Sequence, residues 1–479
     1  MSSDFHALES GGVLRDELRR RMSRPQRHRL LEGYPMAPLL SSTYEGITPI
    51  RSFEYDHSRP LIVGVLPHTF CNPKVKGCGF CTFPHEDFAN EPMRRVVEQV
   101  AREIEHTVQV EPALGKRVVD AVYLGGGTAN LTPPLAMKRL MESLAAAFDL
   151  GGAELSFEGV PRYFLLRDEA LLEVLADARV RHRRISMGIQ TFDPAWLRQM
   201  GRDAFGGVDD IRRVIESGHR RGFTVSGDLL FNLPGTTSEH ALADVRTAIE
   251  LGLDQICVYN LVLTPDLDTV WAGEKDLVQA MPEQATALKT WLEVQEALLS
   301  RGYVQTTLTN FERADVAGSP RRFVYELASF DPAVRDGIGF GPGALSTFTT
   351  GDRQRAFKWR NIPTSEAFAE EMSRGRCPVA AGFRYSAMDM RLLHLTRNLA
   401  RLQIDCPAYE RFFGTNPFWD FPSHFELLMD ARLITLEDRV GRLTPEGMFY
   451  ADAIAGLFAH RRVVELRAYD GGAVDYSMG

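Results

Sequence analysis

The 479-residue sequence has few cysteines, no long apolar run and no excess of basic residues. No stretch reaches the about 18 consecutive apolar residues that a membrane-spanning helix needs, and the N-terminal segment lacks the apolar centre of a signal peptide. The 55 Lys and Arg are outnumbered by 63 Asp and Glu, which leaves no broad basic surface for phosphates. We therefore expect a cytoplasmic protein that acts on small molecules and binds neither membranes nor nucleic acids.

Cysteine is scarce, and its few positions are unevenly distributed. Three of the six cysteines lie in the segment "CNPKVKGCGFC" over 71–81, in the order Cys-x6-Cys-x2-Cys. Three clustered thiolates suit either a zinc site completed by His68 or His85, or an iron–sulfur cluster with one open iron. These residues alone leave both alternatives open. The remaining cysteines stand singly, which argues against a secreted disulfide framework; they are Cys257, Cys377 and Cys406.

Short β-rich apolar runs alternate with longer helical segments from about residue 60 onward. With 44% hydrophobic and 25% charged residues, the composition is that of a globular protein of two or three domains. Helical segments such as 91–108 and 133–148 separate the runs, and this alternation predicts parallel strands joined by crossover helices. The predicted strands are 61–66, 118–124, 153–158, 184–190, 223–231 and 254–261.

Each predicted strand is followed by residues that can bind a ligand or react. Carboxyl ends of parallel strands share one rim, which is where barrel enzymes place their sites. This placement favours an α/β fold with a partial (β/α)6 barrel over an open doubly wound sheet. In chain order the rim residues are the cysteine segment, Gly125–Gly127, Glu158, Gln190, Asp228 and Tyr259.

If the thiolates hold a [4Fe-4S] cluster, the rim suits one particular ligand. An open iron accepts an α-amino-acid chelate, and the glycine run lets backbone atoms approach that ligand closely. Glu158 could bind its ammonium group, while Gln190 and Asp228 could bind ribose hydroxyls. A ligand with these groups is S-adenosylmethionine (SAM), whose radical chemistry belongs to the cofactor.

Several ordered sequence blocks resemble one known family. "CGFC", "YLGGGTANLT", "LSFEGVP", "RISMGIQTFDPAWLRQMGR", "VSGDLLFNLPGTT" and "GIGFGPGALS" are similar in order and spacing to radical SAM proteins of the oxygen-independent coproporphyrinogen III oxidase type (HemN-like). The resemblance favours iron–sulfur over zinc. It implies an N-terminal arm over 1–58, a radical SAM partial barrel over 59–350 and a mainly helical C-terminal domain over 351–479.

The resemblance also implies roles for individual residues and an external electron donor such as flavodoxin or ferredoxin. Cys71, Cys78 and Cys81 would ligate the cluster. The SAM-binding positions would be Phe80, Gly125, Gly126, Gly127, Thr128, Glu158, Gln190, Arg202 and Asp228.

The sequence departs from the family pattern at informative places. The first two cysteines are usually three residues apart, whereas here six residues intervene. Ala129 replaces the proline after the glycine run, Leu345 replaces a histidine, and His68 stands one residue out of step. These departures weigh against porphyrinogen decarboxylation itself.

We therefore expect a radical SAM enzyme related to the class C methyltransferases and cyclopropanating enzymes. It would transfer a methyl or methylene group to an unsaturated carbon of a small substrate, with a second SAM as the carbon source. One alternative is radical decarboxylation or rearrangement of a tetrapyrrole or other metabolite, and another is a non-catalytic heme chaperone. The residue that moves a proton is not fixed by the sequence, and the candidates are His68, His85 and Tyr259.

Overall fold

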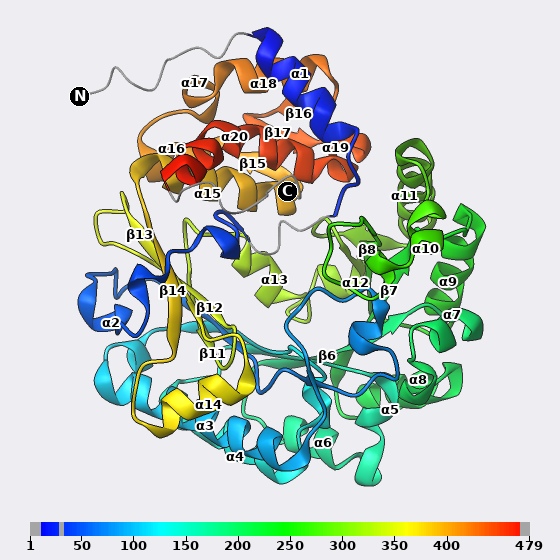
Figure 1. The fold of residues 1–479 in the computed structure, drawn as a ribbon, viewed down its shortest axis with the longest axis vertical. Coiled ribbons are helices and arrows are strands. Elements are labelled where there is room, and N and C mark those ends of the chain that lie inside the picture. Colours follow the sequence, from blue (N-terminus) through cyan, green and yellow to red (C-terminus); the bar gives the residue numbers. More distant parts are fainter. Residues whose placement is uncertain (1–10, 28–32, 470–479) are drawn as a thin grey trace.

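A twelve-stranded sheet forms the centre of the protein (Figure 1). The structure is a computed structural model that describes residues 11–27 and 33–469. The strand order is β14-β13-β12-β11-β1-β4-β5-β6-β7-β8-β10-β9, and the run from β11 to β8 includes all the predicted parallel strands. The predicted strands are confirmed as β1 (Leu61–Val65), β4 (Val119–Leu124), β5 (Glu154–Gly159), β6 (His182–Gln190), β7 (Phe223–Phe231) and β8 (Gln255–Asn260).

Helices cover the outer face of the parallel strands (Figure 1). They form because each crossover segment has an apolar face directed at the sheet, as in α8, where Ile211, Val214 and Ile215 are buried. The α/β fold with a parallel sheet is therefore confirmed. The covering helices are α3 (Asn90–Val110), α4 (Pro134–Ala147), α6 (Leu166–Ala176), α8 (Val208–Arg220), α9 (Ser238–Glu250) and α11 (Gln284–Leu299).

The sheet does not close, and its two sides continue beyond the predicted units. On one side β10 (Asn310–Arg313) pairs antiparallel with β8 and with β9 (Tyr303–Gln305). On the other side β11 (Asp336–Phe340) pairs parallel with β1. The sheet then continues through three antiparallel strands, β12 (Leu345–Thr349), β13 (Ala356–Asn361) and β14 (Val379–Tyr385), and the last two of these lie past residue 350.

The C-terminal part lies over one end of the sheet, at the top of Figure 1. It contains helix α18 (Pro422–Asp430), a β-ribbon of β16 (Ile434–Glu437) and β17 (Val440–Leu443), and helix α20 (Ala451–Tyr469). Helix α1 (Gly11–Met22) of the N-terminal arm packs against α18 and α20.

Gln26 connects this assembly to the barrel. The side chain of Asn260, at the end of β8, donates to the Gln26 carbonyl at 2.7 Å, and the Ala453 N–H of α20 donates to the Gln26 side chain at 3.2 Å. None of the described helices has the length and hydropathy to cross a bilayer.

Candidate active site at the carboxyl ends of the strands

The cysteine loop, residues 71–81, is a compact turn beside β1. Cys71 ends the short strand β2 (Phe70–Cys71), which pairs with β3 (Glu86–Asp87). The Cys78 N–H donates to the Val75 carbonyl at 2.9 Å, and the Cys81 N–H donates to the Gly77 carbonyl at 2.8 Å. Cys78 has a φ of 54°, in the left-handed region. The three cysteines are therefore presented by one tightly hydrogen-bonded loop.

The donor set of this loop fits an iron–sulfur cluster with an open iron. Burial raises the pKa of Cys71 to about 12 and that of Cys81 to about 11, and repulsion between the cysteine sulfurs adds to both shifts. The sulfurs thus lie within electrostatic range of one another. Within residues 11–27 and 33–469, no three His, Cys, Asp or Glu side chains already have metal-holding geometry. Binding would therefore have to draw the three thiolates together, as metal binding commonly does.

The glycine turn, Gly125–Gly127, packs against the backbone of the residues just before Cys71. Gly127 has a φ of +54°, and a Cβ at this position would lie 2.8 Å from the Phe70 carbonyl oxygen and 2.9 Å from the Thr69 carbonyl carbon. The Thr128 N–H donates to the same Phe70 carbonyl at 3.0 Å. Only glycine permits this close contact between two backbone segments.

Two carboxyl groups face the barrel interior beside the glycine turn. Tyr123 donates to Glu158 Oε2 at 2.6 Å, and a Cβ on Gly125 would lie 3.0 Å from the same oxygen. Ser186 donates to Asp228 Oδ1 at 3.0 Å. Burial, reinforced by the negative charge of Glu158, raises the pKa of Asp228 to about 7. Asp228 is therefore partly protonated near neutral pH and can then donate a hydrogen bond.

The end of β6 brings Gln190 and Arg202 to the same place. A bulge between Gly188 and Gln190 accompanies a φ of 73° at Gln190. A Cβ on Gly188 would lie 3.1 Å from Gln190 Nε2 and 3.3 Å from Arg202 Nη2. Arg202 Nη1 is 3.2 Å from Cys78 Sγ, and Nη2 also donates to the Gly188 carbonyl. Arg202 and Gly188 also line a cavity of about 310 Å³ between β6 and α8.

An apolar rim group surrounds the cysteine loop on its other side. A Cβ on Gly79 would lie 2.1 Å from Trp271 Nε1, so the indole rests directly on the loop. Trp271 is 1% exposed, and its ring centroid lies 5.7 Å from that of Phe80 and 5.8 Å from that of Trp196. Such a group excludes water from reactive species. Its buried members are Cys78, Val160, Met200, Phe205, Leu230, Leu233, Leu261, Leu263 and Trp271, and Phe80, Trp196 and Tyr259 pack against them.

The three candidate acid–base residues occupy different environments. His68 is 0% exposed and accepts from the Phe70 N–H at 3.1 Å, and burial lowers its pKa to about 4. His85 packs on Gly77, with Nδ1 2.8 Å from the Phe83 carbonyl. Tyr259 packs against the apolar rim group, and burial raises its pKa well above the ordinary value. Their assignment as acid or base stays a prediction.

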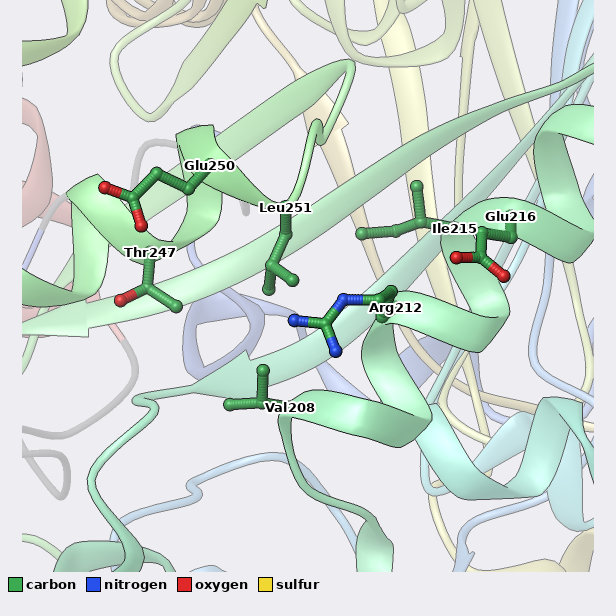
Figure 2. Close-up of a pocket in the computed structure, with 7 residues that line it drawn as sticks. All are labelled: Val208, Arg212, Ile215, Glu216, Thr247, Glu250 and Leu251. Atoms are coloured by element: carbon green, nitrogen blue, oxygen red, sulfur yellow. The ribbon is translucent and has the colours of Figure 1, made fainter.

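Several residues at this site were not predicted from the sequence. Tyr123 could have been found, because it stands two positions before Gly125 on the face of β4 that points inward. Trp196 and Trp271 lie in segments that follow β6 and β8, and the sequence holds no periodic signal that would have selected them. A second cavity, of about 440 Å³, lies between α8 and α9 and includes none of the predicted residues (Figure 2).

Comparison with known proteins assigns the class. Residues 65–266 match the model of the Radical SAM superfamily. Residues 65–266 therefore have the features of a radical SAM domain, the class of domain that binds a [4Fe-4S] cluster and SAM, and the resemblance noted in the sequence is confirmed.

Within this class the chain is similar to HemN and HemW proteins. It is 27% identical to the heme chaperone HemW of Lactococcus lactis, over 49% of this chain and 58% of that relative. It is also 27% identical to the oxygen-independent coproporphyrinogen III oxidase of Salmonella typhimurium, over 59% of each chain. Each match thus spans somewhat less than two thirds of the relative.

A solved structure shows the same fold over most of the chain. The coproporphyrinogen III oxidase HemN of Escherichia coli, a radical SAM enzyme, superposes with a TM-score of 0.72 at 20% identity. The superposition covers 89% of this chain and 96% of HemN, so it includes the C-terminal part as well as the barrel.

Proposed function

We propose that this protein reductively cleaves SAM and uses the resulting 5′-deoxyadenosyl radical to modify a small molecule at the barrel rim. The observation that carries the proposal is the meeting of three distant segments around the cysteine loop. Gly127 contacts the backbone of Thr69 and Phe70, and Arg202 reaches Cys78 Sγ. The three cysteines, the glycine turn and the Arg202 guanidinium thus lie close together. This is the arrangement that a [4Fe-4S] cluster with an amino-acid chelate on its open iron requires.

When bound, a reduced [4Fe-4S] cluster would supply the electron that splits SAM into methionine and a 5′-deoxyadenosyl radical. Cys71, Cys78 and Cys81 would hold the cluster, which an external donor such as flavodoxin or ferredoxin would reduce. The glycine turn with Thr128 would accept the methionine end of SAM. Phe80 would pack beside the cluster, with its backbone touching the adenine. The amino, ribose and carboxylate groups of SAM would be bound by Glu158, Gln190, Arg202 and Asp228.

The chain's own residues orient the ligand and exclude water. Tyr123 fixes Glu158 through a 2.6 Å hydrogen bond, so this carboxylate is already oriented for an ammonium group. Asp228 in its protonated form can donate to a hydroxyl oxygen. The apolar rim group, with Trp271 on Gly79, separates the cysteine loop from solvent on that side.

For the reaction we propose methyl or methylene transfer to an unsaturated carbon, with a second SAM as the carbon donor. Two departures from the oxidase pattern support this choice. Leu345 stands at the start of β12 in place of the histidine, and the cysteine spacing is longer. The 5′-deoxyadenosyl radical would take a hydrogen atom from the methyl group of the second SAM, and the resulting carbon radical would add to the unsaturated carbon. A second electron from the external donor would then allow the carbon–sulfur bond to break, with release of S-adenosylhomocysteine.

A second candidate is radical decarboxylation or rearrangement of a tetrapyrrole without methyl transfer. It is favoured by the similarity to coproporphyrinogen III oxidases, whose name states a tetrapyrrole substrate. A heme chaperone, the third candidate, needs an accessible heme ligand. Cys257 is 2% and Cys406 1% exposed, and Cys377 is only partly exposed, so cysteines outside the loop do not favour this role.

The test is anaerobic reconstitution followed by mass spectrometry of the small-molecule products. Dithionite-reduced protein with SAM should release 5′-deoxyadenosine, and Cys78→Ala should abolish this release together with the brown colour. Cys377→Ala, outside the loop, should retain both.

The products then separate the candidates. S-adenosylhomocysteine formed in proportion to a modified substrate supports methyl or methylene transfer, whereas turnover without it supports the second candidate. A protein that binds heme but never cleaves SAM is a chaperone. A colourless protein that binds only zinc would refute all the radical proposals.

A further inference from the structure

The spacer, residues 72–77 between the first two cysteines, packs onto the rim turn formed by residues 200–203. The Lys74 N–H donates to the Gly201 carbonyl at 3.1 Å, and Lys74 Nζ lies 2.6 Å from Asp203 Oδ2. Gly201 has a φ of +65°, and a Cβ there would lie 2.3 Å from the Val75 nitrogen. The two segments therefore meet backbone to backbone, in a contact that only glycine allows.

The same rim turn carries Arg202, which reaches back to the second cysteine. Arg202 is 6% exposed, and its Nη1 lies 3.2 Å from Cys78 Sγ. Its Nη2 is held by the Gly188 carbonyl at the end of β6. The spacer thus contacts the rim turn at Lys74 and Val75, and Arg202 of the rim turn contacts Cys78. The second terminal nitrogen of the same guanidinium bonds to Gly188 on the sheet.

The length of the spacer is what makes this contact possible. The family that the sequence resembles usually has three residues between these cysteines, and this chain has six. Because an extended residue spans at most about 3.5 Å, three fewer residues would shorten the reach by roughly 10 Å. A three-residue spacer would have correspondingly less chain with which to reach Gly201 and return to Cys78.

We infer that the long spacer is a strap that holds the cysteine loop on the rim turn and fixes Arg202 as a positioning residue at the Cys78 sulfur. The inference rests on the proposed iron–sulfur site and adds a redox role to it. A cationic hydrogen-bond donor at a cluster sulfur stabilises the reduced cluster and raises its reduction potential. The strap thereby favours the one-electron reduction that precedes SAM cleavage.

The strap itself is tested by limited trypsin digestion of the full chain, which requires no cluster. Trypsin can cut after Lys74 and Lys76, and a docked strap resists cleavage. Gly201→Ala should raise the cleavage rate at both bonds on the order of tenfold, because the new Cβ collides with the strap and is strained at positive φ. Gly152→Ala, whose Cβ would have no neighbour within 4 Å, should leave the rate unchanged.

Asp203→Asn provides a milder second variant, since it removes the charge of the ion pair and keeps the side-chain shape. Asp203→Asn should increase the cleavage rate less than Gly201→Ala does. If circular dichroism shows that Gly201→Ala is misfolded, the cleavage rate of Asp203→Asn alone decides the test. The matched control is Asp209→Asn, which breaks an exposed ion pair with Arg212 on α8. Cleavage rates equal to those of the unaltered protein in both strap variants would overturn the strap.

The role of Arg202 is tested by the reduction potential of the reconstituted cluster, followed by electron paramagnetic resonance. Both strap variants should retain iron but show a lower potential than the unaltered protein, and the controls should show none of this shift. Equal potentials, with faster trypsin cleavage, would overturn the positioning role. If the unaltered protein assembles no cluster, the proposed function fails, while the digestion still decides whether the strap exists.

Discussion

Replacing Asp228 with asparagine should change how stability depends on pH. Burial and the neighbouring Glu158 raise the pKa of Asp228 to about 7, from an ordinary value near 3.8. The folded state therefore binds more protons than the unfolded state between these two values. In this window the free energy of unfolding of the wild-type protein falls as the pH rises.

The expected magnitude follows from the size of this shift. One pKa unit corresponds to about 1.36 kcal/mol, so the wild-type protein should lose about 3 kcal/mol between pH 5 and pH 8 through this group. This figure is an upper limit, because the Asp228 side chain is partly exposed and solvent screens its charge. An asparagine side chain at this position cannot ionise, so the variant lacks this loss and gains stability relative to wild type as the pH rises.

Urea unfolding of both proteins at several pH values between 5 and 8 measures the difference. Glu103, whose pKa is raised to about 8 by burial, is present in both proteins and cancels. The pKa of Glu326, raised to about 7 mainly by burial, also contains repulsion from Asp228, so in the variant it falls slightly and adds to the change in the same direction. Asp177→Asn, at an exposed position, should give a curve parallel to wild type. A parallel curve for Asp228→Asn as well would show that Asp228 is ionised throughout this pH range, which would refute the raised pKa.

Three further substitutions test the site. Gly127→Ala should abolish SAM binding in equilibrium dialysis, because its Cβ would lie 2.8 Å from a backbone oxygen, whereas Gly152→Ala should bind normally. Trp271→Ala should lower the free energy of urea unfolding by about 3–5 kcal/mol, since the side chain is 1% exposed. The same change at Trp419, which is 72% exposed, should cost less than about 0.5 kcal/mol. Tyr123→Phe removes the hydrogen bond to the β5 carboxylate and should cost about 1–3 kcal/mol at pH 7 in the same assay, with an unchanged value arguing against that bond.

The parallel strands could be predicted because they are apolar on both faces and are separated by long amphipathic helices. β7 has the predicted bounds, and β1 differs from the prediction by one residue. The short strands β9 to β14 gave no such signal, because three to seven residues with mixed polarity resemble loops.

The polar residues at strand ends were predictable, whereas their partners were not. Arg184, for example, lies inside the barrel and donates to Gln255 at 2.5 Å, with its guanidinium 3.7 Å from the ring centroid of Phe323. Such contacts depend on the register of strands far apart in sequence. The same limit applies to the strap, because Lys74 and Asp203 are 129 positions apart and their pairing follows only from the fold.

The link at Gln26 has a consequence for access to the barrel. This residue is 2% exposed and is hydrogen-bonded both to Asn260 of the sheet and to α20. If α20 moves away from the sheet, either one of the two Gln26 hydrogen bonds breaks or the segment around Gln26 moves with the helix. A substrate entering from that side would therefore have to move α20 together with the segment around Gln26.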